Sequence, residues 1–137
     1  MLHVLIDADN LSPRRLRPVL TVLAELDDPV EVIVSGRQSA LDGSTWPEQA
    51  RLLPQQGWQR ADLALAEAYR PDTDPLVLVS GDGDFGLLAS RHPGPVLVVS
   101  SAASGRLRDG ATVIDPATEG DRPIRAWLRA VGVRLRD

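Results

Sequence analysis

Two acidic clusters follow two apolar runs of the chain. The run Asp-Ala-Asp-Asn at 7–10 comes directly after the apolar residues 2–6, and Asp-Gly-Asp at 82–84 comes just after residues 76–80. Carboxylates crowded into one place repel each other unless protons or a cation neutralise them. A hard divalent cation with oxygen ligands is the simplest neutraliser. The two clusters therefore predict a metal-dependent chemistry on phosphate.

The elements around these clusters alternate between strands and helices. Runs of leucine and β-branched residues predict buried parallel strands at residues 2–6, 30–34, 76–80, 95–99 and 112–114. Helical patterns lie at residues 47–56, 61–69, 85–91 and 121–131. A further helix follows the first strand and begins at Ser12-Pro13 or, because of Pro18, near Arg17. Residues 36–46 are expected to be a loop, and residues 57–60 a turn or a brief edge strand.

This alternation predicts a parallel α/β sandwich. The 137 residues correspond to about one domain. In open sheets of this kind, ligands bind beyond the carboxyl ends of the strands. Both acidic clusters follow strands, so we expect them to share one crevice.

Composition excludes several classes of site. The chain has no cysteine, which rules out disulfides and thiolate metal sites, and all of its 15 basic residues are arginine. Without lysine, Schiff-base chemistry and the Walker-type phosphate loop are excluded. No apolar run approaches the roughly 20 residues of a membrane span, and the first residues lack the features of a signal peptide. We therefore expect a cytoplasmic protein that does not interact with membranes.

Three segments together resemble the NYN domain, a LabA-like branch of the PIN-like nucleases. They are residues 4–11 and 79–85, which contain the two clusters, and residues 61–66, which contain Asp62 on a predicted helix. Their order and rough spacing agree with the family over most of the chain. The resemblance implies one NYN domain over residues 1–137, with a Rossmann-like three-layer sandwich, and a Mg²⁺- or Mn²⁺-dependent endoribonuclease with RNA as its substrate.

The resemblance also implies a role for each matching residue. Asp7 is similar to the primary metal ligand, Asp62 and Asp82 to its partners, and Asp84 to an acid that binds a second metal or positions water. Asn10 is similar to the asparagine that orients the first loop or a substrate phosphate. Four carboxylates of this kind suit Mg²⁺, which keeps several waters and substrate oxygens in its shell.

Some of these acids have simpler explanations. Asp9 belongs to the same motif and is a second-rank candidate, since it can equally bond turn amides. Asp84 can cap the helix that follows it, and Asp62 can be a first-turn acid favoured by the helix dipole. Many family members carry another aspartate near the end of the Asp62 helix, where this chain has Glu67, about 140° around the helix from Asp62. Arg60 is the only candidate for the basic residue that commonly precedes this motif.

Four other residues are candidates for substrate contact. Arg14 and Arg15 follow the first cluster and can meet an RNA backbone. Ser80 shapes the loop after its strand or contacts a phosphate, and Trp46 lies in the predicted polar loop, where it can stack on a base.

Two other functions fit the same residues. A haloacid-dehalogenase-like phosphatase would use Asp7 and Asp9 as nucleophile and acid, residues 34–36 as its second motif, and residues 82–84 as its Mg²⁺ loop. A noncatalytic module would keep the fold to bind RNA or a protein, which the missing helix acid makes plausible. A homodimer or a separate protein partner is compatible with all three functions.

Overall fold

The structure is a computed structural model, and it describes residues 1–9, 11–56, 61–80, 86–100 and 112–136. Within these ranges the side chains of Asp62, Gly86 and Leu87 are not described. Asn10, Arg60, Asp82 and Asp84 therefore lie outside the described residues, as does the turn expected at 57–60.

A parallel sheet of six strands forms the centre of the molecule, in the order β3-β2-β1-β4-β5-β6. Every pair of neighbouring strands is parallel. The strands are β1 (Leu2–Asp7), β2 (Val30–Arg37), β3 (Arg51–Gln55), β4 (Leu76–Val79), β5 (Val96–Val99) and β6 (Thr112–Ile114). This arrangement confirms the predicted α/β class and is consistent with a Rossmann-like three-layer sandwich.

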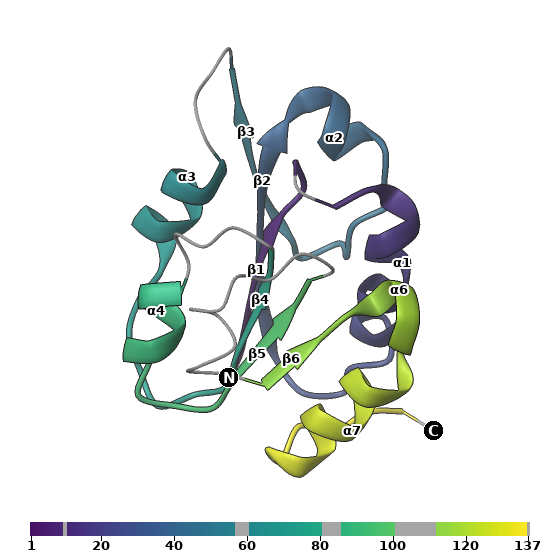
Figure 1. The fold of residues 1–137 in the computed structure, drawn as a ribbon, viewed down its shortest axis with the longest axis vertical. Coiled ribbons are helices and arrows are strands. Elements are labelled where there is room, and N and C mark those ends of the chain that lie inside the picture. Colours follow the sequence, from purple (N-terminus) through teal and green to yellow (C-terminus); the bar gives the residue numbers. More distant parts are fainter. Residues whose placement is uncertain (10, 57–60, 81–85, 101–111, 137) are drawn as a thin grey trace.

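Helices cover both faces of the sheet (Figure 1). They are α1 (Pro13–Leu23), α2 (Gln38–Asp42), α3 (Ala61–Ala68), α4 (Gly86–Arg91), α6 (Pro116–Glu119) and α7 (Arg122–Ala130). Figure 1 shows α3 and α4 on one face and α1, α2, α6 and α7 on the other. The sheet is thus shielded on both sides, as an all-parallel sheet must be.

The core consists of two apolar clusters, one on each face of the sheet. Side chains alternate along a strand, so Val4 and Ile6 join one cluster while Leu5 joins the other. The larger cluster contains the apolar stripe of α1, formed by Leu16, Val19, Val22 and Leu23. In the smaller cluster, Leu65 of α3 is completely buried. These two layers hold the strand ends in fixed positions.

Helix α1 begins where the N-cap pattern predicts. Ser12 is the N-cap, and its side-chain oxygen accepts a hydrogen bond from the backbone N–H of Arg15 at 3.4 Å. The helix contains Pro18 in its interior, so the alternative of a start near Arg17 is wrong. Pro13 at the first helical position suits this start because its missing N–H would have no helical partner there.

The expectations for residues 36–56 are largely wrong. Strand β2 continues through Gly36 and Arg37, and the short helix α2 follows where a loop was expected. A β-carbon at Gly36 would lie 3.1 Å from the β-carbon of Ala8, so a glycine suits the close approach of the two backbones there. Residues 51–55 form strand β3 instead of a helix. Pro54 is tolerated because β3 is an edge strand, where an outward-facing N–H needs no partner in the sheet.

Helix α6 is an additional element that the residue pattern did not predict. Asp115 caps it by accepting a hydrogen bond from the N–H of Ala117 at 2.9 Å, and Pro116 occupies its first turn. The following helix α7 ends close to the predicted boundary.

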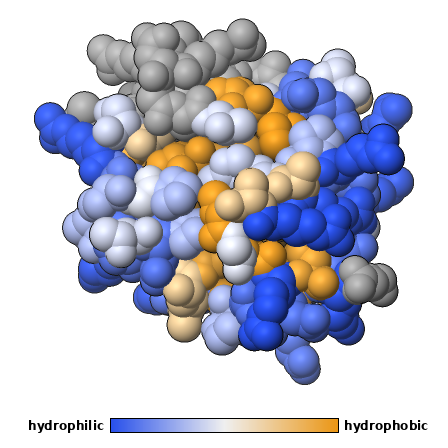
Figure 2. Space-filling model, turned by 90° about the horizontal axis from the view of Figure 1, so that it is seen from below, coloured by the Kyte–Doolittle hydropathy of each residue, from blue (hydrophilic) through white to orange (hydrophobic). Residues whose placement is uncertain are grey.

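The molecular surface has a mixed character. Viewed from below, apolar residues reach the surface near the middle of the molecule, and hydrophilic residues surround them (Figure 2). None of the helices in the described ranges has both the length and the apolar content that crossing a bilayer requires.

Candidate functional site

Asp7 is the last residue of the central strand β1 and is only 2% exposed. Among the side chains that the structure describes, it is the only buried carboxylate. The chain adds β2 and β3 on one side of β1, then returns to add β4, β5 and β6 on the other. The direction of winding thus reverses between β1 and β4, and open α/β sheets bind their ligands at such a reversal.

Small buried polar residues lie on either side of Asp7. Ser35 of β2 is paired in register with Asp7, Ser80 directly follows β4, and Ser100 directly follows β5. All three are nearly inaccessible to solvent. The hydroxyl of Ser35 donates to the backbone oxygen of Leu53 at 2.7 Å. These residues form a polar row along the carboxyl edge of four adjacent strands, β2, β1, β4 and β5.

Asp9 connects the end of β1 to the junction of β2 and α2. Its backbone N–H donates to Oδ1 of Asp7 at 3.0 Å. Its own Oδ1 accepts a hydrogen bond from the N–H of Arg37 at 2.9 Å. The side chain of Asp9 therefore has the turn-bonding role that was the alternative to metal binding, and it helps to hold Asp7 in position.

The convergence of the other predicted acids with Asp7 stays a prediction. Asp62 belongs to the first turn of α3, which packs on β1 and β2, but its side chain is outside the description. Asp82 and Asp84 follow β4, the neighbour of β1, and lie beyond the described residues, as do Asn10 and Arg60. Of these acids, the described backbone places only Asp62, in the first turn of α3 after the carboxyl end of β3.

The predicted substrate residues lie in different environments. Arg14 and Arg15 are exposed in the first turn of α1, directly after the loop that carries Asp9. Trp46 is half-buried against the larger core cluster, and its Nε1–H donates to the backbone oxygen of Leu41 at 2.8 Å. This bond fixes the segment after α2, and base stacking by the indole stays a prediction.

A groove of about 730 Å³ lies between α3 and strands β2 and β3. Glu67 is exposed and lines this groove together with Arg51 and Arg70. Gln55, at the carboxyl end of β3, lies at the end of the groove nearest the edge that carries Asp7. Asp7 itself does not line the groove, so Glu67 faces a different space from Asp7.

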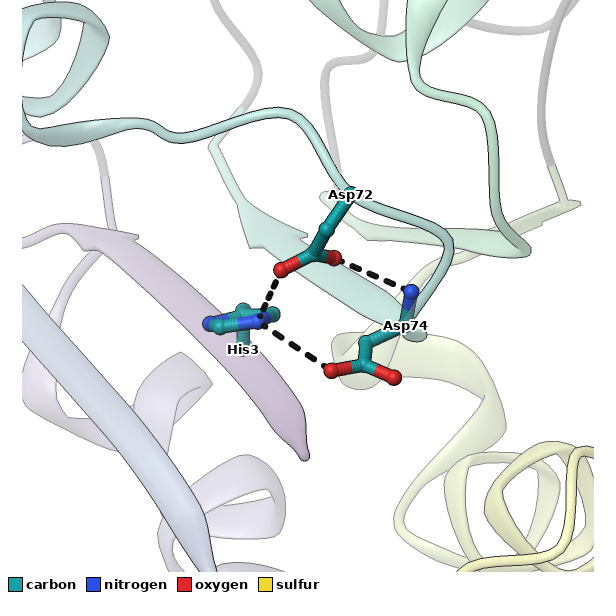
Figure 3. A group of neighbouring side chains, drawn as sticks. All are labelled: His3, Asp72 and Asp74. Carbon is teal, nitrogen blue, oxygen red and sulfur yellow. Dashed lines mark hydrogen bonds and ion pairs between the residues drawn. The ribbon is translucent and has the colours of Figure 1, made fainter.

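A second polar cluster lies at the amino end of β1 (Figure 3). Nε2 of His3 is 2.9 Å from Oδ2 of Asp72 and 3.8 Å from Oδ2 of Asp74. Both aspartates belong to the connection between α3 and β4. The potential ligand atoms of the three residues lie within 4.8 Å of one another, so this group can hold a metal ion. His3 was not among the candidates from the sequence, because only the pairing of β1 with β4 brings the aspartates close to it.

The charges of this second cluster already have partners within the protein. Nδ1 of His3 lies 3.2 Å from Oε1 of Glu31, and the amino group of Met1 lies 2.7 Å from Oδ2 of Asp74. The hydrogen bond from this amino group is the main reason that the pKa of Asp74 is lowered. The cluster is thus at the opposite end of β1 from Asp7, and its members contact Glu31 and the amino group of Met1 as well as one another.

Two aromatic rings extend this cluster into the protein. Nε2 of His92 is 2.7 Å from the backbone oxygen of Asp74, so Nε2 carries the proton and donates. Nδ1 of the same ring lies 2.7 Å from the hydroxyl of Tyr69, which therefore donates to it. Burial, followed by the negative charge of Asp72, raises the pKa of Tyr69. These bonds make the connection before β4 a rigid part of the scaffold.

Comparison of the sequence with known protein families and with curated proteins found no match.

Proposed function

We propose that the protein is a metal-dependent ribonuclease of the NYN type, acting at the carboxyl edge of its sheet. The observation that carries this proposal is Asp7, a buried carboxylate at the point where the winding of the sheet reverses. A buried charge is costly unless it is paired or coordinates a metal. Retaining such a group at a position where α/β sheets bind ligands favours a functional role over a structural one.

The donor chemistry of this edge fits a hard divalent cation. Asp7 supplies carboxylate oxygen, and its buried neighbours Ser35, Ser80 and Ser100 are small and polar. In the proposal, Asp7, Asp62, Asp82 and Asp84 hold Mg²⁺ or Mn²⁺. When bound, the metal would lower the pKa of a water and stabilise charge on a phosphoryl group. Asp9 would act indirectly, through its backbone bond to Asp7.

RNA as the substrate rests on the resemblance to NYN domains and on the exposed arginines beside the edge. Arg14 and Arg15 begin α1 close to the end of β1, where a phosphate backbone entering the site would pass. No lysine competes for this role, since the chain has none.

The phosphatase alternative has less support from the contacts. In that alternative, Ser35 would bind the phosphate and Asp9 would act as acid and base. The hydroxyl of Ser35 instead donates to the backbone of β3, and the carboxylate of Asp9 accepts the N–H of Arg37. Both groups would have to break these bonds to act on a substrate.

Cleavage of labelled RNA tests the proposal. Single-stranded and structured RNA are incubated with the full chain in the presence of Mn²⁺ or of a chelator. We expect cleavage with Mn²⁺ only, and a loss of at least about a hundredfold in Asp7→Asn or Asp82→Asn, as for removal of a group that stabilises the transition state. Asp42→Asn is the matched control because Asp42 is exposed on α2, where its carboxylate accepts a hydrogen bond from Gln38.

Two results would reject the proposal. One is the absence of metal-dependent cleavage on any of the RNAs. The other is cleavage that Asp7→Asn and Asp82→Asn leave unchanged relative to Asp42→Asn, because a contaminating nuclease would then be the source. RNA binding without affinity for divalent metal would favour a noncatalytic module.

A further inference from the structure

A hollow of about 410 Å³ lies between α1 and the segment that follows α2. Pro13, Arg17 and Thr21 line it from one side of α1, at intervals of one helical turn. Ser44 and Thr45 line it from the opposite segment. Helices α1 and α2 are on the same face of the sheet, away from the groove beside α3 (Figure 1).

The lining of this hollow combines polar and apolar residues. Arg17, Thr21, Ser44 and Thr45 are the polar ones, and Pro13 and Leu20 are apolar. Within the described part of the chain, no carboxylate lines the hollow and none is paired with Arg17. An arginine fork beside several hydroxyl donors is an arrangement that binds phosphate oxygens.

Ser44 provides an independent indication that the hollow binds a ligand. Its hydroxyl oxygen is shielded from solvent and has no hydrogen-bond partner among the described residues. A buried polar atom without a partner costs stability, and native proteins rarely leave one in that state. Rotation about the χ1 bond of Ser44 can turn this hydroxyl toward a ligand oxygen in the hollow.

The segment that carries Ser44 is held in place by the surrounding structure. Trp46 anchors its far end through the hydrogen bond to Leu41. At its near end, a β-carbon on Gly43 would lie 3.3 Å from Cγ of Pro13, which shows how closely the segment approaches α1. The segment opposite α1 is therefore held close to the helix, which lowers the entropic cost of ordering it on binding.

We propose that this hollow, lined by Arg17, Thr21, Ser44 and Thr45, is a phosphate-binding site. The phosphate is either free inorganic phosphate or a phosphate of an RNA backbone. The second source rests on the proposed nuclease function, whereas the site itself does not. Hydroxyls and a guanidinium bind the same oxygens in both cases, so the two sources share one chemistry.

Titration of the full chain with inorganic phosphate, followed by amide NMR shifts at constant ionic strength, tests the site. We expect saturable shifts at Thr21, Ser44 and Thr45, and binding about tenfold weaker in Arg17→Gln because a charge-assisted bond is lost. Arg91→Gln is the matched control: Arg91 is exposed on α4, on the opposite face of the sheet. Shifts that do not saturate, or that Arg17→Gln leaves unchanged, would overturn the proposal.

Ser44→Ala separates a ligand-binding role from a structural one. This variant removes a hydroxyl that has no hydrogen-bond partner among the described residues, so stability without phosphate should stay the same or rise. Phosphate affinity should fall several-fold at the same time. A loss of stability in the free protein with unchanged phosphate affinity would contradict the role of Ser44 in the site.

RNA binding then identifies the source of the phosphate. Affinity for a short single-stranded RNA is measured without divalent metal in an Asp7→Asn background, so that cleavage cannot interfere. If an RNA phosphate occupies the site, Arg17→Gln should make the slope of the logarithm of the binding constant against the logarithm of the salt concentration less steep by about 0.7. Unchanged RNA affinity together with weakened phosphate binding would identify free phosphate as the ligand. Neither result depends on whether the protein cleaves RNA.

Discussion

Replacing Asp7 by asparagine removes one buried charge and keeps nearly the same shape at the end of β1. The asparagine oxygen can still accept the hydrogen bond that Asp9 donates to Oδ1. Asn is a neutral ligand, however, and binds a divalent cation far more weakly than a carboxylate does. Without metal, the variant therefore keeps the contact with Asp9, and its unfolding midpoint is the reference for the effect of metal.

Metal addition should separate the natural chain from the variant. A cation that binds only the folded state, at about 100 times its dissociation constant, raises the free energy of unfolding by about 2.7 kcal/mol. For 137 residues, the unfolding entropy is about 0.29 kcal/mol per kelvin, so the midpoint of thermal unfolding should rise by roughly 9 °C. Asp7→Asn should show only a small part of this rise.

Thermal unfolding followed by circular dichroism, in chelator and in increasing Mn²⁺, measures both effects. His3→Gln is an informative control because His3 belongs to the other group that can hold a metal, at the opposite end of β1. If the stabilising ion binds at Asp7, His3→Gln should keep the full response to Mn²⁺. An equal rise in the natural chain and in Asp7→Asn would refute the reasoning, and loss of the rise in His3→Gln alone would place the ion at the other end of the strand.

The remaining predictions concern the scaffold. Leu65→Ala should lower the free energy of unfolding by about 2–5 kcal/mol in urea titrations because Leu65 is fully buried, whereas Leu63→Ala on the exposed side of α3 should change it by less than about 0.5 kcal/mol. Gly94→Ala should cost at least about 1–3 kcal/mol by the same assay, since its β-carbon would collide with backbone carbonyls of the α3–β4 connection. Acid should also destabilise the protein. A hydrogen bond from the side chain of Arg125 holds the pKa of Glu25 below its ordinary value of 4.5, and a hydrogen bond from the backbone of Arg134 holds the pKa of Asp28 below its ordinary value of 3.8. A carboxyl whose pKa is lower in the folded state than in the unfolded state stabilises the fold at pH values above its unfolded pKa. This contribution to stability should be complete above pH about 5 and lost as the pH falls through the folded-state pKa values. A urea midpoint that stays constant down to pH about 3 would contradict this prediction.

The central strands could be predicted from sequence because parallel strands are covered on both faces. Such strands consist of continuous apolar runs, as β1, β4 and β5 do. Strand β3 has no such run: Arg51, Pro54 and Gln55 are all untypical of a buried strand. It is a strand because it pairs with β2 at the edge of the sheet, and that pairing depends on tertiary structure.

The candidate site was only partly accessible from sequence for a related reason. Asp7 was predicted because a carboxylate directly after an apolar run is unusual and recognisable. Ser35 and Ser100 carry no such signal. A serine at the end of a strand can be placed beside Asp7 only when the pairing of the strands with β1 is known. Arg17 and Ser44 were not singled out either, because they come together only through the packing of α1 against the segment after α2.

The central position of β1 has a consequence for how the chain folds during synthesis. One of its partners, β2, is complete at Arg37, while the other, β4, ends at Val79, about 40 residues later. At about 5–20 residues per second, roughly 2 to 8 s separate the appearance of the two partners. During that interval one edge of an almost entirely apolar strand has no native neighbour and can pair with other chains. Slower translation between β2 and β4 should therefore lower the soluble yield without altering the stability of the folded protein.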